Sequence, residues 1–97
     1  MKKVFVSMPM KGKSPGEIAL EQNRILALAA EKFGGGVELV PNFLGGEELA
    51  PLECLGESLK RMATADGVVF GEGWESARGC KIERLCAEKY GIPILNI

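Results

Sequence analysis

The sequence predicts one α/β domain over residues 1–97, with a parallel sheet of about four strands and helices on both faces, in three layers. Four short apolar runs alternate with three segments of helical periodicity, and this alternation is typical of parallel sheets with right-handed crossovers. The runs lack the polar alternation of half-exposed strands, as expected for strands buried on both faces. Hydrophobic residues make up 46% of the chain, and no linker or internal repeat divides it, so we expect a single core.

The expected strands span residues 4–6, 37–40, 66–70 and 92–97. The first helix begins at Pro15, because Ser14 and Glu17 have the spacing of a capping box and proline is favoured at the first helical position. It ends at Gly34, since glycine readily adopts the left-handed conformation of a helix C-cap.

Two further helices follow. The second starts at Pro51, after an irregular connection over residues 41–50, and its apolar side chains recur at intervals of three and four. The third is expected to have Ser76 as its N-cap and to end at Gly91. Its expected core-face residues are Ile82, Leu85, Cys86 and Lys89. Together these elements predict a Rossmann-like or flavodoxin-like sheet.

The charge balance argues against a polymeric nucleic acid or a membrane as partner. Twelve Lys and Arg residues stand against 13 Asp and Glu, a formal charge of -1, and binding to such polyanions depends on a basic surface. The apolar stretches fall far short of the ~20 residues of a membrane span. Ser7 and Pro9 also interrupt the N-terminal run before a signal-peptide core develops. We therefore expect a cytoplasmic protein.

The chain has three cysteines and no histidine. An odd number of cysteines without C-x-x-C spacing makes neither a disulfide framework nor a zinc site, so we expect Cys54, Cys80 and Cys86 to be packing residues. The absence of histidine removes Ser-His and Cys-His nucleophile pairs and histidine-bound metals. We expect no metal and no cofactor, so any catalysis must use carboxylates, hydroxyls, lysines or backbone dipoles.

Ligands of parallel sheets bind beyond the carboxyl ends of the strands, near the switch in strand order. Three connections should meet there: residues 7–14, 41–46 and 71–79. In the first, Gly12-Lys13-Ser14 ends a phosphate-loop pattern whose first glycine position holds Ser7. Three interpretations stay open: a nucleoside-triphosphatase loop, a general phosphate or carboxylate cradle at a helix N-terminus, and a plain turn with solvated lysines.

A second group of candidates surrounds the third helix. On a helical wheel, Ser76, Gly79 and Glu83 fall within about 60° of one another, which suits a substrate-facing carboxylate beside a small residue against which something packs closely. The alternative is a solvated glutamate paired with a neighbouring Arg or Lys. Asp66 is explained as a turn residue whose carboxylate accepts hydrogen bonds from nearby backbone amides. Trp74, the single tryptophan, either stacks on a ring-shaped ligand or covers the core or an interface.

Three stretches carry a more specific pattern. They are residues 4–12 (VFVSMPMKG), 62–69 (MATADGVV) and 73–83 (GWESARGCKIE), the last continuing to Pro93. These stretches resemble the nucleoside 2-deoxyribosyltransferase-like superfamily, and most of all its short bacterial and phage branch. With the matching order of elements, the similarity spans nearly the whole chain and implies a nucleoside or nucleotide as the small-molecule partner.

The resemblance implies that Glu83 is a nucleophile, which attacks the anomeric carbon of a 2-deoxynucleoside or its 5′-phosphate and displaces the base. Acceptance of the sugar by a second base or by water then gives a deoxyribosyltransferase or an N-glycosidase. The resemblance also implies that Asp66 helps to bind the ligand and that a shell of small and loop residues surrounds the sugar and its 5′ end. This implied shell comprises Ser7, Met8, Gly12, Ser76 and Gly79.

Two departures from the superfamily leave an alternative open. Phe5 stands where its enzymes commonly place a tyrosine that orients the nucleophile, and Glu75 is the nearest match to an aspartate near the base. The alternative is a non-catalytic nucleotide-binding module on the same fold. Because a four-stranded parallel sheet has two exposed edges, we also expect a homodimer or a higher homo-oligomer, with Phe43, Leu44 and Trp74 in its surface.

Overall fold

The computed structural model describes residues 1–41 and 48–97, in which three strands alternate with three α-helices. The elements are β1 (Lys2–Ser7), α1 (Pro15–Phe33), β2 (Val37–Leu39), α2 (Pro51–Met62), β3 (Gly67–Phe70), the 3-10 turn η1 (Trp74–Ser76) and α3 (Arg78–Tyr90). The predicted α/β class with a parallel sheet is confirmed. Most of the expected connection over residues 41–50, with Phe43 and Leu44, lies outside the described residues.

The sheet is open, and its strand order is β2-β1-β3, with both pairings parallel. β1 lies in the centre, where Val4 pairs with Leu39 of β2 on one side and with Gly67 of β3 on the other. The chain thus moves outward from β1 in both directions, which is how flavodoxin-like sheets begin. The carboxyl ends of β1 and β3 form the switch point at which such sheets bind ligands.

The expected fourth strand over residues 92–97 forms only a single parallel bridge, between Ile94 and Val68. Two hydrogen bonds hold it: Val68 N–H donates to Pro93 O over 2.9 Å, and Leu95 N–H donates to Val68 O over 2.9 Å. The C-terminal segment therefore lies along β3 without becoming a strand, and the described sheet has three strands where about four were expected.

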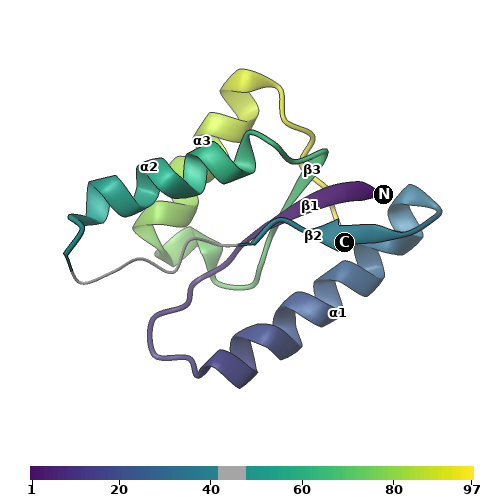
Figure 1. Cartoon of the computed structure of the whole chain (residues 1–97), viewed down its shortest axis with the longest axis horizontal. Helices are drawn as coiled ribbons and strands as arrows, with labels where there is room; N and C mark the ends of the chain where they lie inside the picture. The colour runs from purple at the N-terminus through teal and green to yellow at the C-terminus, as the bar shows by residue number, and fades with distance from the viewer. Residues whose placement is uncertain (42–47) are drawn as a thin grey trace.

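Helices cover both faces of the sheet: α1 lies against one face, and α2 and α3 lie against the other (Figure 1). The alternation of side chains along a strand explains how β1 serves both faces. Val6 packs with Ile25 of α1 in one buried cluster, whereas Phe5 packs with Met62 of α2 and Ala87 of α3 in a second cluster. β1 is therefore the strand around which both halves of the core are built.

The start of α1 follows the sequence prediction closely. Ser14 Oγ accepts the N–H of Glu17 over 3.2 Å, and Glu17 Oε1 accepts the N–H of Ser14 over 3.1 Å, with Pro15 in the first turn. Gly34 caps the other end in the left-handed conformation, at φ 70°. The capping box thus engages the Ser14 hydroxyl that a phosphate loop would need for its metal ion.

The start of α3 differs from the expectation. Its N-cap is Ala77, and Ser76 belongs to η1, where its hydroxyl donates to Gly73 O over 2.9 Å. Because that hydroxyl closes its own turn, it does not reach the first amides of α3. The predicted N-cap role of Ser76 is therefore wrong.

The face of α3 that meets the sheet also differs from the expected one. Leu85, expected in the core, is 54% exposed. The buried residues of the helix are Cys80, Glu83 and Ala87. Cys80 and Ala87 have small side chains, and Glu83 is buried between them along the helix instead of lying beside the core.

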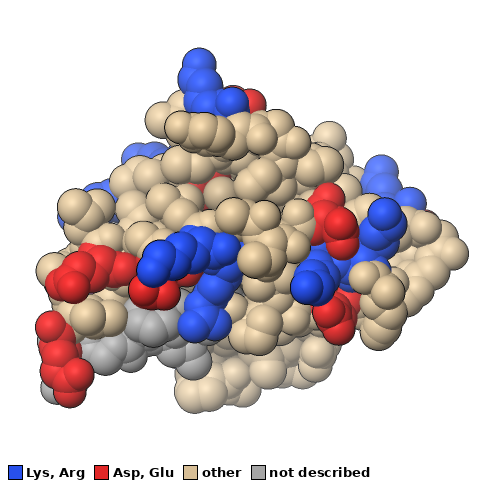
Figure 2. Space-filling view, turned by 45° about the horizontal axis from the view of Figure 1, so that its top comes forward, with Lys and Arg blue, Asp and Glu red and all other residues tan. Residues whose placement is uncertain are grey.

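Charges of both signs lie next to one another on the face drawn in Figure 2, and broad uncharged areas separate the groups. In that view the described residues form no extended basic surface. Within the described ranges, no helix combines the length and the apolar character that a membrane crossing requires.

Candidate functional site

The candidate site lies where β1 ends. A hollow of about 290 Å³ opens beyond Ser7, between the loop after β1, the first turns of α2 and the first turns of α3. Its lining residues are Ser7, Met8, Pro9, Met10, Pro51, Cys54, Leu55, Ser58, Ala77, Gly79, Cys80 and Glu83. Its place at the carboxyl end of the central strand is the one at which open α/β sheets bind ligands.

Glu83 and Ser7 form the polar centre of this hollow. Ser7 Oγ donates a hydrogen bond to Glu83 Oε1 over 2.6 Å, a length typical of a hydroxyl bound to a carboxylate. Ser7 is 2% exposed and Glu83 is 7% exposed. Among the residues that the structure describes, Ser7 is the one hydrogen-bond donor to this carboxylate. Ser7 thereby fixes one carboxylate oxygen, and the other oxygen keeps its capacity to engage a ligand.

The register between β1 and α3 brings these two residues together. Phe5 and Ser7 point to the same face of the sheet because they are two residues apart on a strand. Ala87 and Glu83 lie on the same face of α3 because they are four residues apart on a helix. Phe5 packs with Ala87 in the core, so Glu83, one turn earlier, meets Ser7 at the end of the strand.

Burial gives Glu83 unusual titration behaviour. Removal from water raises the pKa of Glu83, and the hydrogen bond from Ser7 opposes this effect in part. The cause is that a buried carboxylate loses the hydration that stabilises its charge. A carboxylate with a pKa perturbed in this way, in a hollow at a strand end, is typical of a functional site.

Cys80 lies one turn before Glu83 and lines the same hollow. Burial and the neighbouring Glu83 charge raise the pKa of the Cys80 thiol, whereas its contact with the Ser7 hydroxyl lowers it. A thiol with a raised pKa stays protonated near neutral pH and is a poor nucleophile.

Within residues 1–41 and 48–97, no three His, Cys, Asp or Glu side chains converge as a metal site would require.

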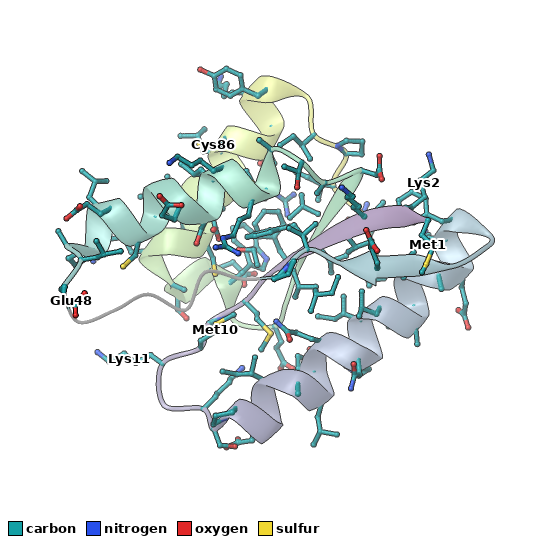
Figure 3. The ribbon with its side chains drawn as sticks, viewed as in Figure 1. Met1, Lys2, Met10, Lys11, Glu48 and Cys86 are labelled. Carbon is teal, nitrogen blue, oxygen red and sulfur yellow. The ribbon has the colours of Figure 1, made fainter. Side chains whose placement is uncertain are left out.

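Two more of the predicted residues, Met8 and Gly79, line the hollow. A Cβ placed on Gly79 would meet no heavy atom within 4 Å among the described residues outside its own stretch of helix. Gly79 therefore borders open space, and the described part of the chain does not pack closely against the helix at this glycine. Gly12 forms a turn at φ 81° and does not line the hollow, and Lys11 beside it points away from the ribbon in Figure 3.

Asp66 lies at the opposite end of the sheet. Its Oδ2 accepts the N–H of Lys3 over 2.7 Å, and its own N–H donates to Lys3 O over 2.7 Å. Figure 3 shows Lys2 at that end of β1 and Met10 beyond the other end. Asp66 thus ties the start of β3 to the start of β1, as a turn residue does, and the structure does not bring it to Glu83.

Trp74 and Ser76 do not line the Glu83 hollow. The Trp74 ring packs on Phe70, with 5.5 Å between ring centroids. The guanidinium carbon of Arg84 lies 4.9 Å from the centroid of the Trp74 ring, within the range of a cation–π contact. The tryptophan therefore packs on its own chain, and the exposed Ser76 follows it in η1.

The sequence reasoning missed the contribution of α2 to the site. Cys54, Leu55 and Ser58 line the hollow from this helix. Ser58 follows Leu55 by three residues and Cys54 by four, which places it beside both on the helix surface, and this spacing is visible in the sequence. Only the packing of α2 beside α3 determines that this face borders the Glu83 hollow.

Comparisons with known proteins give a likeness of fold. No family model matches the chain, and no curated protein matches it. Among solved structures, a conserved protein from Enterococcus faecalis V583 is similar, with a TM-score of 0.59 and 17% sequence identity. The match covers 97% of this chain and 61% of that protein, so the chain spans less than two thirds of its length. At this identity the likeness shows that the two chains share a fold.

Proposed function

We propose that the chain binds a nucleoside or nucleotide in the Glu83 hollow and cleaves the bond between sugar and base, with Glu83 as the nucleophile. The observation that carries the proposal is the 2.6 Å hydrogen bond from Ser7 to a buried carboxylate at the ligand-binding edge of the sheet. Ser7 supplies a hydroxyl that orients the carboxylate, a role for which Phe5 has no polar atom. The reaction class rests on the resemblance of residues 73–83 to the nucleoside 2-deoxyribosyltransferase-like superfamily.

The proposed reaction has two displacements. In the first, a Glu83 carboxylate oxygen attacks C1′ of the sugar, the C1′–N bond breaks, and its electron pair leaves with the base, which takes up a proton from water. In the second, water attacks C1′, the ester bond between C1′ and Glu83 breaks, and the water proton passes to solvent. Hydrolysis yields free base and free sugar, whereas a second base as acceptor yields a new nucleoside.

A substitution pair on α3 tests this role. Glu83→Gln keeps the size of the side chain but removes the nucleophilic charge, so base release from 2′-deoxynucleosides and their 5′-monophosphates should fall by at least ~10³-fold. Glu88→Gln is the matched control, because Glu88 is exposed on the same helix and pairs with Arg84. Free base is measured by liquid chromatography. Equal rates for wild type and Glu83→Gln would reject Glu83 as the nucleophile.

The covalent intermediate gives a second, independent test. A 2-fluoro-substituted nucleoside slows breakdown of the glycosyl ester, because fluorine destabilises the positive charge that develops at C1′. Intact-mass spectrometry should then detect wild-type protein carrying one sugar, and peptide mapping should place the sugar on Glu83. The Glu83→Gln protein should remain unlabelled.

A non-catalytic nucleotide-binding module is the second candidate. Two observations favour it: Phe5 is buried in the core without a hydroxyl, and burial raises the pKa of Glu83, which favours a protonated carboxyl that binds ligands by hydrogen bonds. Wild-type protein that binds a nucleotide but releases no base from any common nucleoside or nucleotide would establish this alternative.

A further inference from the structure

We propose that Cys80 is a positioning residue, which donates a hydrogen bond from its thiol to the Ser7 hydroxyl and thereby keeps the Ser7 proton directed at Glu83. The three side chains then form a hydrogen-bond relay, from the thiol through the hydroxyl to the carboxylate. This inference deepens the proposed function and rests on it for the role of Glu83. Its decisive test follows the carboxylate and the thiol themselves, so it does not depend on base release.

The fold places Cys80 beside the two other members of the relay. Cys80 precedes Glu83 by three residues on α3, so the two side chains are neighbours on the helix surface. Cys80 is 6% exposed, and it lines the hollow together with Ser7 and Glu83. The thiol contacts the Ser7 hydroxyl, which lowers the pKa of Cys80 against the larger, raising effect of burial. Since Ser7 is also bound to Glu83, the hydroxyl is the middle member.

The direction of each hydrogen bond follows from the number of protons. A hydroxyl has one proton to donate and two lone pairs that accept. Ser7 gives its proton to Glu83 Oε1 over 2.6 Å, so toward Cys80 the hydroxyl can only accept. Burial raises the pKa of the Cys80 thiol, which therefore keeps its proton near neutral pH and can donate it. Because each hydrogen bond in such a chain polarises the next, the thiol strengthens the bond from Ser7 to the carboxylate.

The alternative is that Cys80 only fills space, as a buried cysteine often does. The two roles predict opposite effects on Glu83 when the thiol is removed. Loss of packing admits water, which stabilises the charged carboxylate and lowers its pKa. Loss of a donor weakens the hydrogen bond from Ser7 and raises that pKa.

The titration of Glu83 is suited to this distinction. Among the described residues that line the hollow, the titratable side chains are Cys54 on α2 and Cys80 and Glu83 on α3, and the loop after β1 contributes none. No second carboxylate from these residues therefore obscures the midpoint of Glu83.

Carbon NMR titration of the labelled Glu83 carboxyl group tests the relay in wild type, Cys80→Ala, Ser7→Ala and the double variant, after circular dichroism has verified their folding. Cys80→Ala should move the midpoint to higher pH. In the Ser7→Ala background the same substitution should not move it, because Cys80 acts through Ser7. Cys86→Ala is the matched control and should leave the midpoint unchanged, since Cys86 packs against the second core cluster and does not line the hollow.

Infrared spectroscopy follows the thiol in the wild-type protein. The S–H stretching band moves to lower frequency when a thiol donates a hydrogen bond, and the difference spectrum between wild type and Cys80→Ser identifies the band of Cys80. Once Glu83 is protonated, its own proton faces the Ser7 oxygen, and the Ser7 proton turns toward the sulfur. The band of Cys80 should therefore move to higher frequency as pH falls through the Glu83 midpoint.

Base release gives a third readout. Below the Glu83 midpoint the rate should fall about twofold to fivefold in Cys80→Ala, as expected for the loss of one weak hydrogen bond. It should be unchanged well above the midpoint, where the carboxylate is ionised in both proteins. Cys80→Ser should restore the wild-type rate at the lower pH, because a hydroxyl also donates.

Three results would overturn the relay and leave the proposed reaction intact. They are a midpoint that does not move or moves to lower pH in Cys80→Ala, an equal shift with and without the Ser7 hydroxyl, and an S–H band that does not respond to protonation of Glu83. Conversely, a wild type that shows the expected shifts but releases no base would support the relay and reject the catalytic role of Glu83.

Discussion

A carboxylate that is 7% exposed, as Glu83 is, lowers the stability of the fold when it is ionised. Burial raises its pKa in the folded state, so its favourable contribution belongs to the protonated form. That contribution is complete below the unfolded pKa of about 4.3 and is lost as pH rises through the folded pKa. We therefore expect Glu83→Gln to be more stable than wild type at neutral pH, by more than the ~0.5 kcal/mol of a typical surface substitution.

Urea unfolding at neutral pH and near pH 3 measures this difference. The advantage of Glu83→Gln should disappear at the lower pH, where the wild-type carboxyl is protonated in both states. Glu88→Gln should instead cost up to ~0.5 kcal/mol at neutral pH, because it removes an exposed ion pair with Arg84. A Glu83→Gln protein no more stable than wild type at neutral pH would contradict the buried, ionisable carboxylate described above.

Ser7 is a positioning residue in this description, because it acts on the ligand through Glu83. Its hydrogen bond lowers the pKa of Glu83, so Ser7→Ala should raise that pKa further. Carbon NMR titration of the labelled carboxyl group should show the midpoint at higher pH in Ser7→Ala than in wild type. The acid limb of the rate of base release should move in the same direction. A midpoint that does not move would mean that the hydroxyl does not stabilise the carboxylate.

At the scale of the secondary-structure element, substitutions at two helix glycines distinguish effects on stability from effects on ligand binding. Gly79 in α3 and Gly56 in α2 both have space for a Cβ, which at either position would meet no heavy atom within 4 Å among the described residues outside its own stretch of helix. Alanine should therefore stabilise each helix, by up to about 1 kcal/mol. Gly79 lines the Glu83 hollow, whereas Gly56 does not. Gly79→Ala should then weaken nucleotide binding, while Gly56→Ala leaves it unchanged.

Thermal unfolding and calorimetric binding of a nucleotide test the pair. If both variants bind as the wild type does, the boundary at Gly79 is not part of the ligand site. If Gly79→Ala is destabilised, the open space beside this glycine is not present in solution.

Local signals in the sequence predicted the three helices and three of the four expected strands, but not how these elements face one another. The capping box at Ser14, which is confirmed, was predictable because it depends only on residues three positions apart. The burial of Glu83 depends on which face of α3 meets the sheet, and that face carries the small residues Cys80 and Ala87. Apolar periodicity favoured Leu85 instead, because it ranks side chains by hydrophobicity and ignores the contour of the strand they meet.

The opposite positions of Asp66 and Glu83 are likewise a property of the topology. Both residues were candidates for one site, yet Asp66 precedes a strand and Ser7 ends one. Because parallel strands place all their starting residues at one edge of the sheet, Asp66 meets Lys3, far along β1 from Ser7. The direction of the strands, which was correctly predicted, was the information needed to exclude this pairing.

At the scale of the whole molecule, β1 joins the two halves of the core. The described chain has a radius of gyration of 12.7 Å, close to the ~12.5 Å of a compact domain of this length. Val6 contributes to the cluster under α1, and Phe5 contributes to the cluster under α2 and α3. Val6 is 0% exposed and Phe5 is 1% exposed, so a smaller side chain at either position would leave a cavity in the core.

We expect the chain to unfold as one cooperative unit for this reason. Val6→Ala should lower the free energy of unfolding by about 2–3 kcal/mol and Phe5→Ala by about 3–5 kcal/mol, a large part of the ~5–15 kcal/mol of a small domain. The fluorescence of Trp74, which packs on Phe70 at the end of β3, reports one side of the molecule, and far-ultraviolet circular dichroism reports all helices. In both variants the two transitions should coincide, because weakening either cluster displaces the strand that supports the other. A Val6→Ala protein that loses part of its helical signal before its tryptophan signal would show instead that the two halves of the core unfold separately.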